Sequence, residues 1–261
     1  MKKLNLLIGI LIGLTILSCS SDDENSDNNP PIENTKLLKQ ISWNDGYSEK
    51  YFYDSQNRLI LTTHNDFAFA DNSFNDSTFV DYTNSNISKI LKREQSGGDI
   101  VNTELIFNNY NSTNASGTFK IFTDSGNNFS DLTFEYSFIN NLLKSYTRLN
   151  LDGTKSYEQI FNHNNGGNLT EWNEIWYSTN NQIDNANYNT ITEWDSGNRV
   201  TEKLFAWDSE YLPGFAISTN NCLNLIDSDT TYNYIFEYDS DGYVTKYTLD
   251  NGDFFTLEYY E

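Results

Sequence analysis

The chain has 261 residues, of which 15% are aromatic and 20% charged, and its formal net charge is −21. This composition excludes a coiled coil or a helical bundle, because Ala, Leu, Glu and Lys do not dominate it, and the many aromatic residues argue against a disordered chain. The negative charge repels phosphate backbones, so we expect no nucleic-acid partner.

Residues 1–18 predict export from the cytoplasm. Two lysines precede an apolar run that is too short to span a membrane as a helix. Leu17-Ser18-Cys19-Ser20 resembles the lipobox of bacterial lipoproteins, in which the peptide is cut before the cysteine and the thiol is acylated. The resemblance implies palmitate-type lipid on Cys19, attachment to the membrane through this lipid and an outer-membrane location. A plain secretory signal with a chance cysteine is the alternative.

A polar segment, residues 19–35, follows the predicted cleavage site. Ser21, Asp22, Asp23 and Glu24 resemble the export tag that carries lipoproteins of Bacteroidetes-type bacteria to the outer face of the outer membrane. An ordinary acidic linker is the alternative. In either case we expect a disordered acidic tether.

Residues 36–261 form one predicted domain in which apolar and polar side chains alternate. For example, Tyr232, Tyr234, Phe236 and Tyr238 share one face of a predicted strand. Such alternation is typical of a sheet with one apolar and one wet side. We therefore expect an all-β fold, an antiparallel meander of hairpin repeats that forms a twisted, curled or half-closed sheet.

Asx-Gly dipeptides separate several of these runs and predict type I′ hairpin turns, which require positive φ at both central residues. They are Asp45-Gly46, Asp152-Gly153 and Asn251-Gly252. Around the last two, we expect residues 143–151 to pair with 154–161 and residues 243–250 to pair with 253–260.

An internal repeat becomes visible when the turns are aligned. It consists of an aromatic residue, Asp or Asn, a short polar turn and an aliphatic residue that opens the next strand. The copies are residues 53–59, 194–200 and 238–244, with weaker copies at 161–169 and 82–87. We expect Asp or Asn to bond the turn backbone, and the aromatic and aliphatic residues to face the core.

This pattern resembles the YD repeats of Rhs-type proteins, and residues 51–54 (YFYD) and 236–239 (FEYD) carry it best. Small Bacteroidetes-type surface lipoproteins with degenerate YD-like hairpins look similar over the whole length. The resemblance implies a twisted or half-closed antiparallel sheet without the shell that large Rhs proteins build. Most members of the small-lipoprotein group lack a defined activity.

Residues 206–230 interrupt the alternation and predict an irregular insertion that contains Cys222. Three interpretations stay open: the segment caps an end of the sheet, contains a short helix, or lines a binding site. If Cys19 is acylated, Cys222 has no cysteine to pair with, so no intramolecular disulfide is expected.

Catalytic and metal-binding motifs are not found in the sequence. His64 and His163 have no second His or Cys at metal-ligand spacing, and no nucleophile motif or phosphate-binding loop occurs. We therefore expect no enzymatic activity, no metal and no cofactor. The leading hypothesis is a surface lipoprotein with a non-enzymatic interaction or structural module. A carboxylate-based hydrolase is a remote alternative.

Tryptophans offer a second hypothesis, a glycan-binding module. Trp172 and Trp176 share one face of the predicted strand 169–177. If the other face is the core, both would be exposed and could stack on a glycan or a protein partner, together with Trp43 and Trp207. The alternative is that this strand is buried on both sides.

Overall fold

The computed structural model describes residues 36–65, 76–96, 99–140, 142–178, 180–196, 218–227 and 230–261. Cys19 and the predicted tag Ser21-Asp22-Asp23-Glu24 lie outside these ranges, as do Trp207 and much of the 206–230 segment. In the described part of the chain, no helix is long and apolar enough to cross a membrane.

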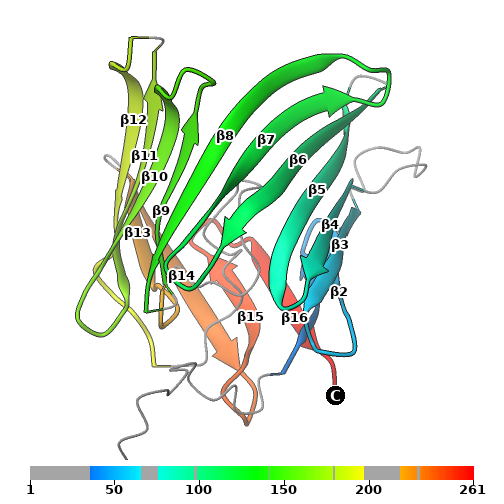
Figure 1. Cartoon of the computed structure of the whole chain (residues 1–261). Coiled ribbons are helices and arrows are strands. Elements are labelled where there is room, and N and C mark those ends of the chain that lie inside the picture. The colour runs from blue at the N-terminus through cyan, green and yellow to red at the C-terminus, as the bar shows by residue number, and fades with distance from the viewer. Residues whose placement is uncertain are drawn as a thin grey trace, which may run out of the picture. The chain divides into compact units, whose positions relative to one another are not determined.

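Among the described residues, sixteen antiparallel strands form one closed barrel, in which each strand pairs with its neighbours in sequence (Figure 1). The strands are β1 (Leu38–Trp43), β2 (Ser48–Tyr53), β3 (Leu59–Asn65), β4 (Asp76–Thr83), β5 (Asn86–Ser96), β6 (Asp99–Tyr110), β7 (Asn114–Thr123), β8 (Asn128–Ile139), β9 (Leu142–Leu149), β10 (Lys155–His163), β11 (Leu169–Tyr177), β12 (Ile183–Thr190), β13 (Asn224–Asp227), β14 (Thr230–Tyr238), β15 (Val244–Leu249) and β16 (Phe254–Tyr259). The 206–230 segment, predicted to be irregular, thus contains β13.

Pairing of the first strand with the last closes the barrel. Ile41 on β1 lies opposite Leu257 on β16, and Trp43 lies opposite Phe255. The predicted twisted, curled or half-closed sheet is therefore wrong, because the first and last strands pair with each other and close the barrel.

Register shifts beside the turns provide a physical reason for closure. They occur at Phe52/Tyr53 between β2 and β3, at Asp81/Tyr82 between β4 and β5, and at Glu237/Tyr238 between β14 and β15. A bulge bends its strand and increases the local twist, so bulges repeated around a sheet favour curling until the two edges meet.

The two ends of the described chain, residues 36 and 261, lie at the same end of the barrel, the lower end in Figure 1. Because strand direction alternates, every second turn returns to this end. The YD-like turns 54–58, 164–168 and 239–243 all lie there, whereas turns 44–47, 124–127, 150–154, 178–182 and 250–253 lie at the upper end.

Asp54 organises the first YD-like turn. Its carboxylate accepts hydrogen bonds from the backbone N–H groups of Gln56 (2.8 Å) and Arg58 (3.0 Å). Its own N–H donates to the Arg58 carbonyl (2.9 Å), and Asn57 takes a positive φ of 60°. The predicted role of the Asp in bonding the turn backbone is confirmed here.

Asp239 and Asn164 organise their turns in the same way. The Asp239 carboxylate accepts from the N–H groups of Asp241 and Tyr243, and Asn164 Oδ1 accepts from those of Gly166 and Asn168. The weak copy is therefore centred on Asn164, two residues later than the alignment that begins at Phe161 predicts.

Hairpin turns at the upper end differ from the type I′ prediction. Gly153 has a positive φ of 83°, whereas Asp152 does not. The Gly153 N–H donates to the Asn150 carbonyl (2.9 Å) and the Asn150 N–H to the Thr154 carbonyl (2.8 Å). This arrangement is a type I turn followed by one left-handed residue, the common three-residue hairpin loop. The predicted pairings across these turns, β9 with β10 and β15 with β16, are confirmed.

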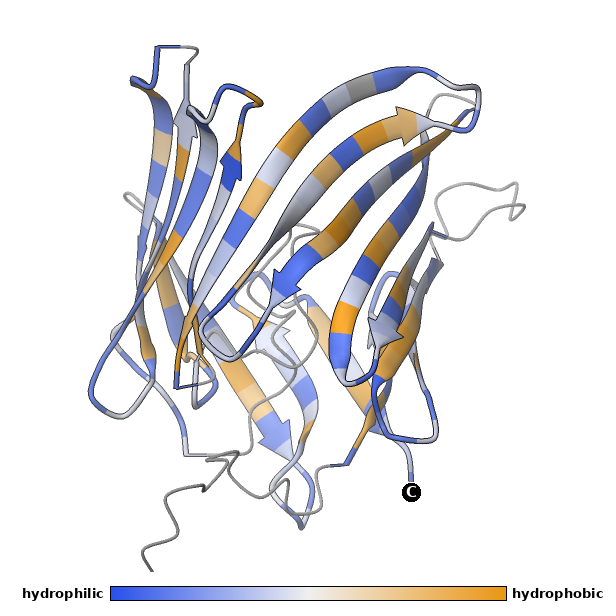
Figure 2. Ribbon diagram, viewed as in Figure 1, coloured by the Kyte–Doolittle hydropathy of each residue, from blue (hydrophilic) through white to orange (hydrophobic). Residues whose placement is uncertain are grey.

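Aromatic side chains fill the inward face of the barrel wall. On β8, Phe134, Tyr136 and Phe138 are buried, whereas Glu135 is exposed on the outward face. Figure 2 shows the resulting alternation as stripes along β5 to β8. Two clusters of buried residues form the core, one on β4 to β11 with residues 191 and 222, the other on β1, β2, β15 and β16.

Charged residues occupy the outward face around the barrel. Ion pairs there join Lys89 to Glu104 (2.6 Å), Lys120 to Asp131 (3.8 Å) and Lys246 to Glu237 (2.9 Å). Membrane-spanning barrels have the opposite polarity, apolar outside and polar inside. In addition, β1, β2, β15 and β16 have only six residues each, fewer than the roughly 9–11 that a spanning strand needs.

One apolar row crosses the outward face of β2 to β5. It consists of Phe52, Leu61, Phe79 and Leu91, which are register partners in this order. Phe52 is 38% exposed and Phe79 is 39% exposed. The row is one side chain wide along each strand, because Lys50, Asp81 and Lys89 follow on the same face.

Candidate functional site

Polar and aromatic side chains meet on the inward face of β9 to β12, toward the upper end of the barrel. Strand register arranges them in three rows. The first row is Arg148, Tyr157, Trp176 and Asn185, the second is Tyr146, Gln159, Glu174 and Asn187, and the third is Phe161, Trp172 and Asn189. We call these three rows the inner polar–aromatic face.

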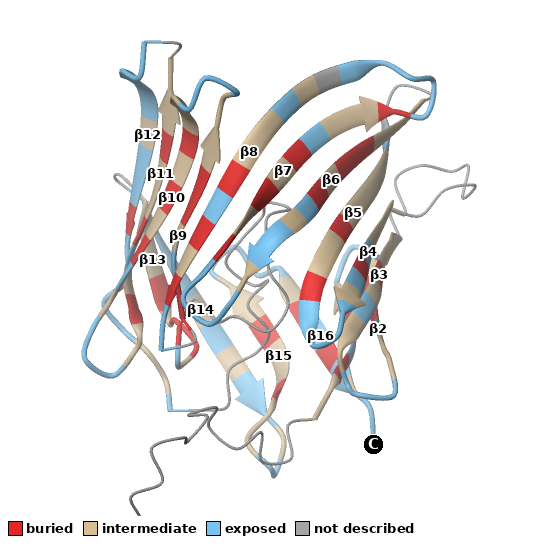
Figure 3. Ribbon diagram, in the orientation of Figure 1, coloured by how far each residue is buried: buried red, intermediate tan, exposed pale blue. Residues whose placement is uncertain are grey.

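Exposure along β12 shows that this face is open to solvent at the upper end. Asn185 and Asn187 point inward, yet both are exposed, and the upper part of β12 is largely pale blue in Figure 3. Asn189, one row deeper, is only 5% exposed, and Trp172 in the same row is 8% exposed. In the first two rows solvent therefore reaches the β12 asparagines and, in part, Trp176 and Glu174 on β11, whereas Tyr157, Tyr146 and Gln159 are buried.

Glu174 is the acidic residue in the middle row. Its Oε1 atom accepts a hydrogen bond from the Tyr157 hydroxyl (2.7 Å) and a longer one from Gln159 Nε2 (3.4 Å). Because the Gln159 side chain is buried, its neighbours restrict its rotation, and its amide donates to Glu174 from one direction. The carboxylate is therefore held in place while part of its hydrogen-bonding capacity stays available.

Aromatic rings surround this carboxylate. The rings of Tyr157 and Trp176 lie 5.3 Å apart at 52°, and the Arg148 guanidinium lies 4.3 Å from the centre of the Tyr157 ring. Below them, Phe161 and Trp172 stack in parallel at 6.5 Å. These ring and cation–π contacts restrain the side chains before any ligand arrives.

The predicted tryptophans do not form an exposed row on the outer surface. Trp172 and Trp176 share a face as predicted, but this face is the inward one, and Trp172 is buried. Trp43 packs in the other hydrophobic cluster, against Phe255 (5.2 Å) and His64 (5.8 Å). Trp207 lies outside the described residues, so the structure brings together only Trp172 and Trp176.

Sequence reasoning missed Tyr157 and the two exposed asparagines of β12. Glu174 could be placed beside the tryptophans from the sequence, because it lies between Trp172 and Trp176 at spacing two and must share their face. No local sequence signal indicates Tyr157 or Asn187, because only the register of β10 and β12 against β11 brings them to this face.

Metal-ligating residues do not gather in the described part of the chain: no group of three or more His, Cys, Asp or Glu is placed to hold an ion. His64 lies among rings, 5.4 Å from Tyr47 and 5.8 Å from Trp43. Cys222 is fully buried, and desolvation raises the pKa of its thiol to about 12. A thiol in this state is a poor nucleophile.

A hollow of about 310 Å³ lies on the outer wall over β7 to β9. Its lining residues are Asn114, Ala115, Ser116, Glu135, Tyr136, Ser137, Ser145 and Thr147. The hydroxyl oxygens of Ser137 and Ser145 lie 2.6 Å apart and satisfy each other. The hollow results from short outward side chains, with one carboxylate at its edge.

Two solved structures from Bacteroides species match this chain. A porin-like protein from Bacteroides uniformis has a TM-score of 0.57 and 16% sequence identity, over 86% of this chain and 98% of that one. A porin-like protein from Bacteroides vulgatus has a TM-score of 0.44 and 9% identity, over 87% of this chain and 99% of that one.

No protein-family model and no curated protein matches the sequence. The likeness to the Bacteroides uniformis structure therefore concerns the fold alone, which in the described residues of this chain is a closed antiparallel barrel.

Proposed function

We propose that this protein is a lipid-anchored outer-membrane protein whose barrel stands in water and serves as a non-enzymatic binding module. The observation that carries the proposal is the polarity of the barrel wall. Aromatic residues point inward and ion pairs such as Lys120–Asp131 cover the outside. A wall of this kind is stable in water and costly in lipid, where a charged side chain near the midplane costs about 2–4 kcal/mol.

The position of residue 36 supports attachment through a tether. Residue 36, to which the acidic segment 19–35 is joined in sequence, lies at the lower end of the barrel, where β1 begins. The exposed asparagines of the inner polar–aromatic face lie toward the opposite, upper end of the barrel. Display on the cell exterior is the orientation that the Ser21-Asp22-Asp23-Glu24 tag predicts.

Binding rather than catalysis fits the inner polar–aromatic face. Glu174 is held by Tyr157 and Gln159 as a hydrogen-bond acceptor, and aromatic rings flank it. Polar groups of fixed direction beside apolar rings are what a recognition site requires.

Removal of the lipidated cysteine tests whether the lipid alone holds the protein at the membrane. Residues 1–19 are replaced by a secretory signal that is cleaved without lipidation. We expect the secreted protein to be soluble without detergent, whereas the unmodified protein stays with the outer membrane. A protein that still resists extraction by alkaline carbonate after losing its lipid would contradict a water-facing barrel.

Orientation requires a separate experiment. Protease treatment of intact cells should degrade the unmodified protein, and palmitate labelling should disappear in the Cys19→Ala variant. Complete protection in intact cells, together with degradation after lysis, would place the barrel in the periplasm instead.

A further inference from the structure

We infer that the inner polar–aromatic face binds a neutral saccharide. The inference rests on the proposed function, since it specifies the ligand of the same binding module. The observations that carry it are the exposed β12 asparagines of the first two rows, the positioned carboxylate of Glu174 and the half-buried ring of Trp176 beside it.

Trp176 provides the apolar surface that such a ligand needs. It is half-buried, and its ring leans against Tyr157 on the neighbouring strand at 5.3 Å, so its orientation is restrained from that side. The C–H groups on one face of a sugar ring form an apolar patch that packs on an aromatic ring. A restrained ring loses little conformational entropy on binding, which favours affinity.

Glu174, Asn185 and Asn187 provide the polar groups beside this ring. Glu174 accepts hydrogen bonds, and the two amides on the next strand both donate and accept. Among the described residues, the Asn187 side chain has no hydrogen-bond partner, although it points inward. Vicinal hydroxyls of a sugar match this mixture of donors and acceptors at neighbouring positions.

Trp172, one row deeper, adds an unsatisfied donor. Its indole N–H is buried and finds no acceptor in the described part of the chain, while the whole residue is only 8% exposed. A buried donor without a partner is costly. A water enclosed between this group and a ligand bound in the second row would satisfy it.

Charge favours a neutral ligand over an acidic one. The chain carries a net charge of −21, and Glu174 lies at the centre of the face. The one cation of these rows, Arg148, packs its guanidinium on the Tyr157 ring at 4.3 Å. An acidic sugar would therefore meet net repulsion.

Titration calorimetry with defined oligosaccharides tests the inference on the full-length protein in detergent micelles. The probes are neutral tetrasaccharides of β-1,4-glucose, β-1,4-xylose, β-1,4-mannose and α-1,4-glucose, with tetragalacturonate as the acidic counterpart. We expect binding of at least one neutral probe and none of tetragalacturonate. Failure of all neutral probes at millimolar concentration, or binding of the acidic probe alone, would overturn the inference.

Variants locate the site. Trp176→Ala should weaken binding at least about tenfold, as loss of a central aromatic contact does, and Asn187→Ala about threefold to tenfold. Tyr188→Ala is the matched control, because Tyr188 adjoins Asn187 on β12 but points outward and is 56% exposed. Asn187→Ala keeps the test valid if Trp176→Ala does not fold. Equal affinity in Asn187→Ala and the unmodified protein, or loss of binding in Tyr188→Ala, would contradict the assigned face.

The two proposals fail separately. A barrel that stays in the membrane without its lipid refutes the proposed function whatever the sugars do. A barrel that is released and soluble, yet binds no neutral probe, refutes only the saccharide inference.

Discussion

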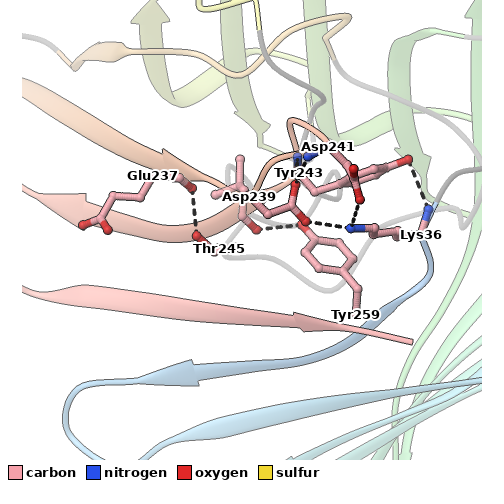
Figure 4. Close-up of polar contacts among 8 residues, drawn as sticks. Lys36, Glu237, Asp239, Asp241, Tyr243, Thr245 and Tyr259 are labelled. Atoms are coloured by element: carbon pink, nitrogen blue, oxygen red, sulfur yellow. Dashed lines mark hydrogen bonds and ion pairs between the residues drawn. The ribbon is translucent and has the colours of Figure 1, made fainter. Parts of the chain in front are cut away.

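The Lys36 ammonium donates to the Asp239 carboxylate at 2.8 Å and thereby joins the first described residue to the turn between β14 and β15 (Figure 4). It also lies 2.6 Å from Asp241 and 5.1 Å from the centre of the Tyr243 ring. The backbone N–H of Lys36 donates to the Tyr243 hydroxyl at 3.2 Å.

The first YD-like turn also pairs its aspartate with a cation that lies over a tyrosine ring, but there the cation belongs to the turn itself. There Arg58 pairs with Asp54 at 2.6 Å and places its guanidinium 4.3 Å from the Tyr82 ring. Tyr243 occupies the position that corresponds to Arg58, so the turn at Asp239 lacks a cation of its own. Lys36, distant in sequence, supplies it.

Removal of the Lys36 charge should loosen the seam between β1 and β16. For Lys36→Met we expect faster amide hydrogen exchange on β1, and a fall in melting temperature of no more than about 3 °C because the pair is only partly buried. Lys39→Met is the control, since Lys39 pairs only with Glu258 on the surface, at 3.2 Å. Equal exchange in both variants would show that the contact at Asp239 does not hold the seam.

Asp239 should make the stability depend on pH in the acidic range. The hydrogen bond from Lys36, followed by the backbone N–H of Tyr243, lowers the pKa of Asp239 below its ordinary value of 3.8. A carboxyl whose pKa is depressed by folding stabilises the protein above its unfolded pKa and loses this contribution as pH falls through the folded pKa.

The Asp239→Asn variant tests this dependence, because an amide keeps the turn hydrogen bonds, as Asn164 shows in its own turn. We expect it to be less stable than the unmodified protein at pH 7, with the difference vanishing below pH 3.8. Asp45→Asn is the control, since Asp45 caps the Tyr47 N–H but has no ion pair among the described residues. Urea unfolding at a series of pH values measures both. A difference that grows on acidification would contradict the linkage.

Gly117 should tolerate no side chain. A Cβ atom at this position would lie 1.9 Å from the Ile106 carbonyl oxygen and 2.9 Å from Cζ of Phe134. Because the backbone of β6 must move to accept it, we expect Gly117→Ala to lower the free energy of unfolding by about 1–3 kcal/mol or more. Ser116→Ala, on the outward face of the same strand, should cost far less. Denaturant unfolding measures the free energy of unfolding of both variants. Equal values for Gly117→Ala and Ser116→Ala would mean that β6 and β7 pack less closely than the structure shows.

Cys222 should be inert in the folded barrel. It is fully buried, and its thiol pKa of about 12 leaves almost no thiolate at pH 8. In the secreted form that lacks Cys19, we expect an aromatic disulfide reagent to react only when urea unfolds the protein. One equivalent of reaction within minutes under native conditions would contradict the burial of this thiol.

The hairpins of this fold could be predicted from local sequence, but their closure could not. Asp54 and Asp239 indicate turns, because each carboxylate bonds backbone N–H groups of its own turn. The strands on either side of Gly153 and Gly252 can be predicted from the alternation of apolar and polar residues. Nothing near Ile41 indicates that it pairs with Leu257, because that contact depends on the accumulated curvature of all the strands between them.

The site was partly predictable for the same reason. Alternation correctly put Trp172 and Trp176 on one face, but it cannot tell which face turns inward. Both faces of β11 carry buried residues, since Ile175 on the outward side is as little exposed as Trp172, at 8%. Only the closed barrel distinguishes the two faces.

The most direct test of the account is a disulfide across the seam that closes the barrel. Ser42 and Thr256 are outward register partners on β1 and β16, at a separation that an engineered disulfide can span. In Ser42→Cys/Thr256→Cys we predict nearly complete crosslinking under mild oxidation, detected by mass spectrometry of peptides. The shifted pair Ser42→Cys/Glu258→Cys should crosslink poorly. Absence of the first crosslink, or equal yields for the two pairs, would contradict a closed barrel and, with it, the enclosed face that Glu174 and Trp176 share.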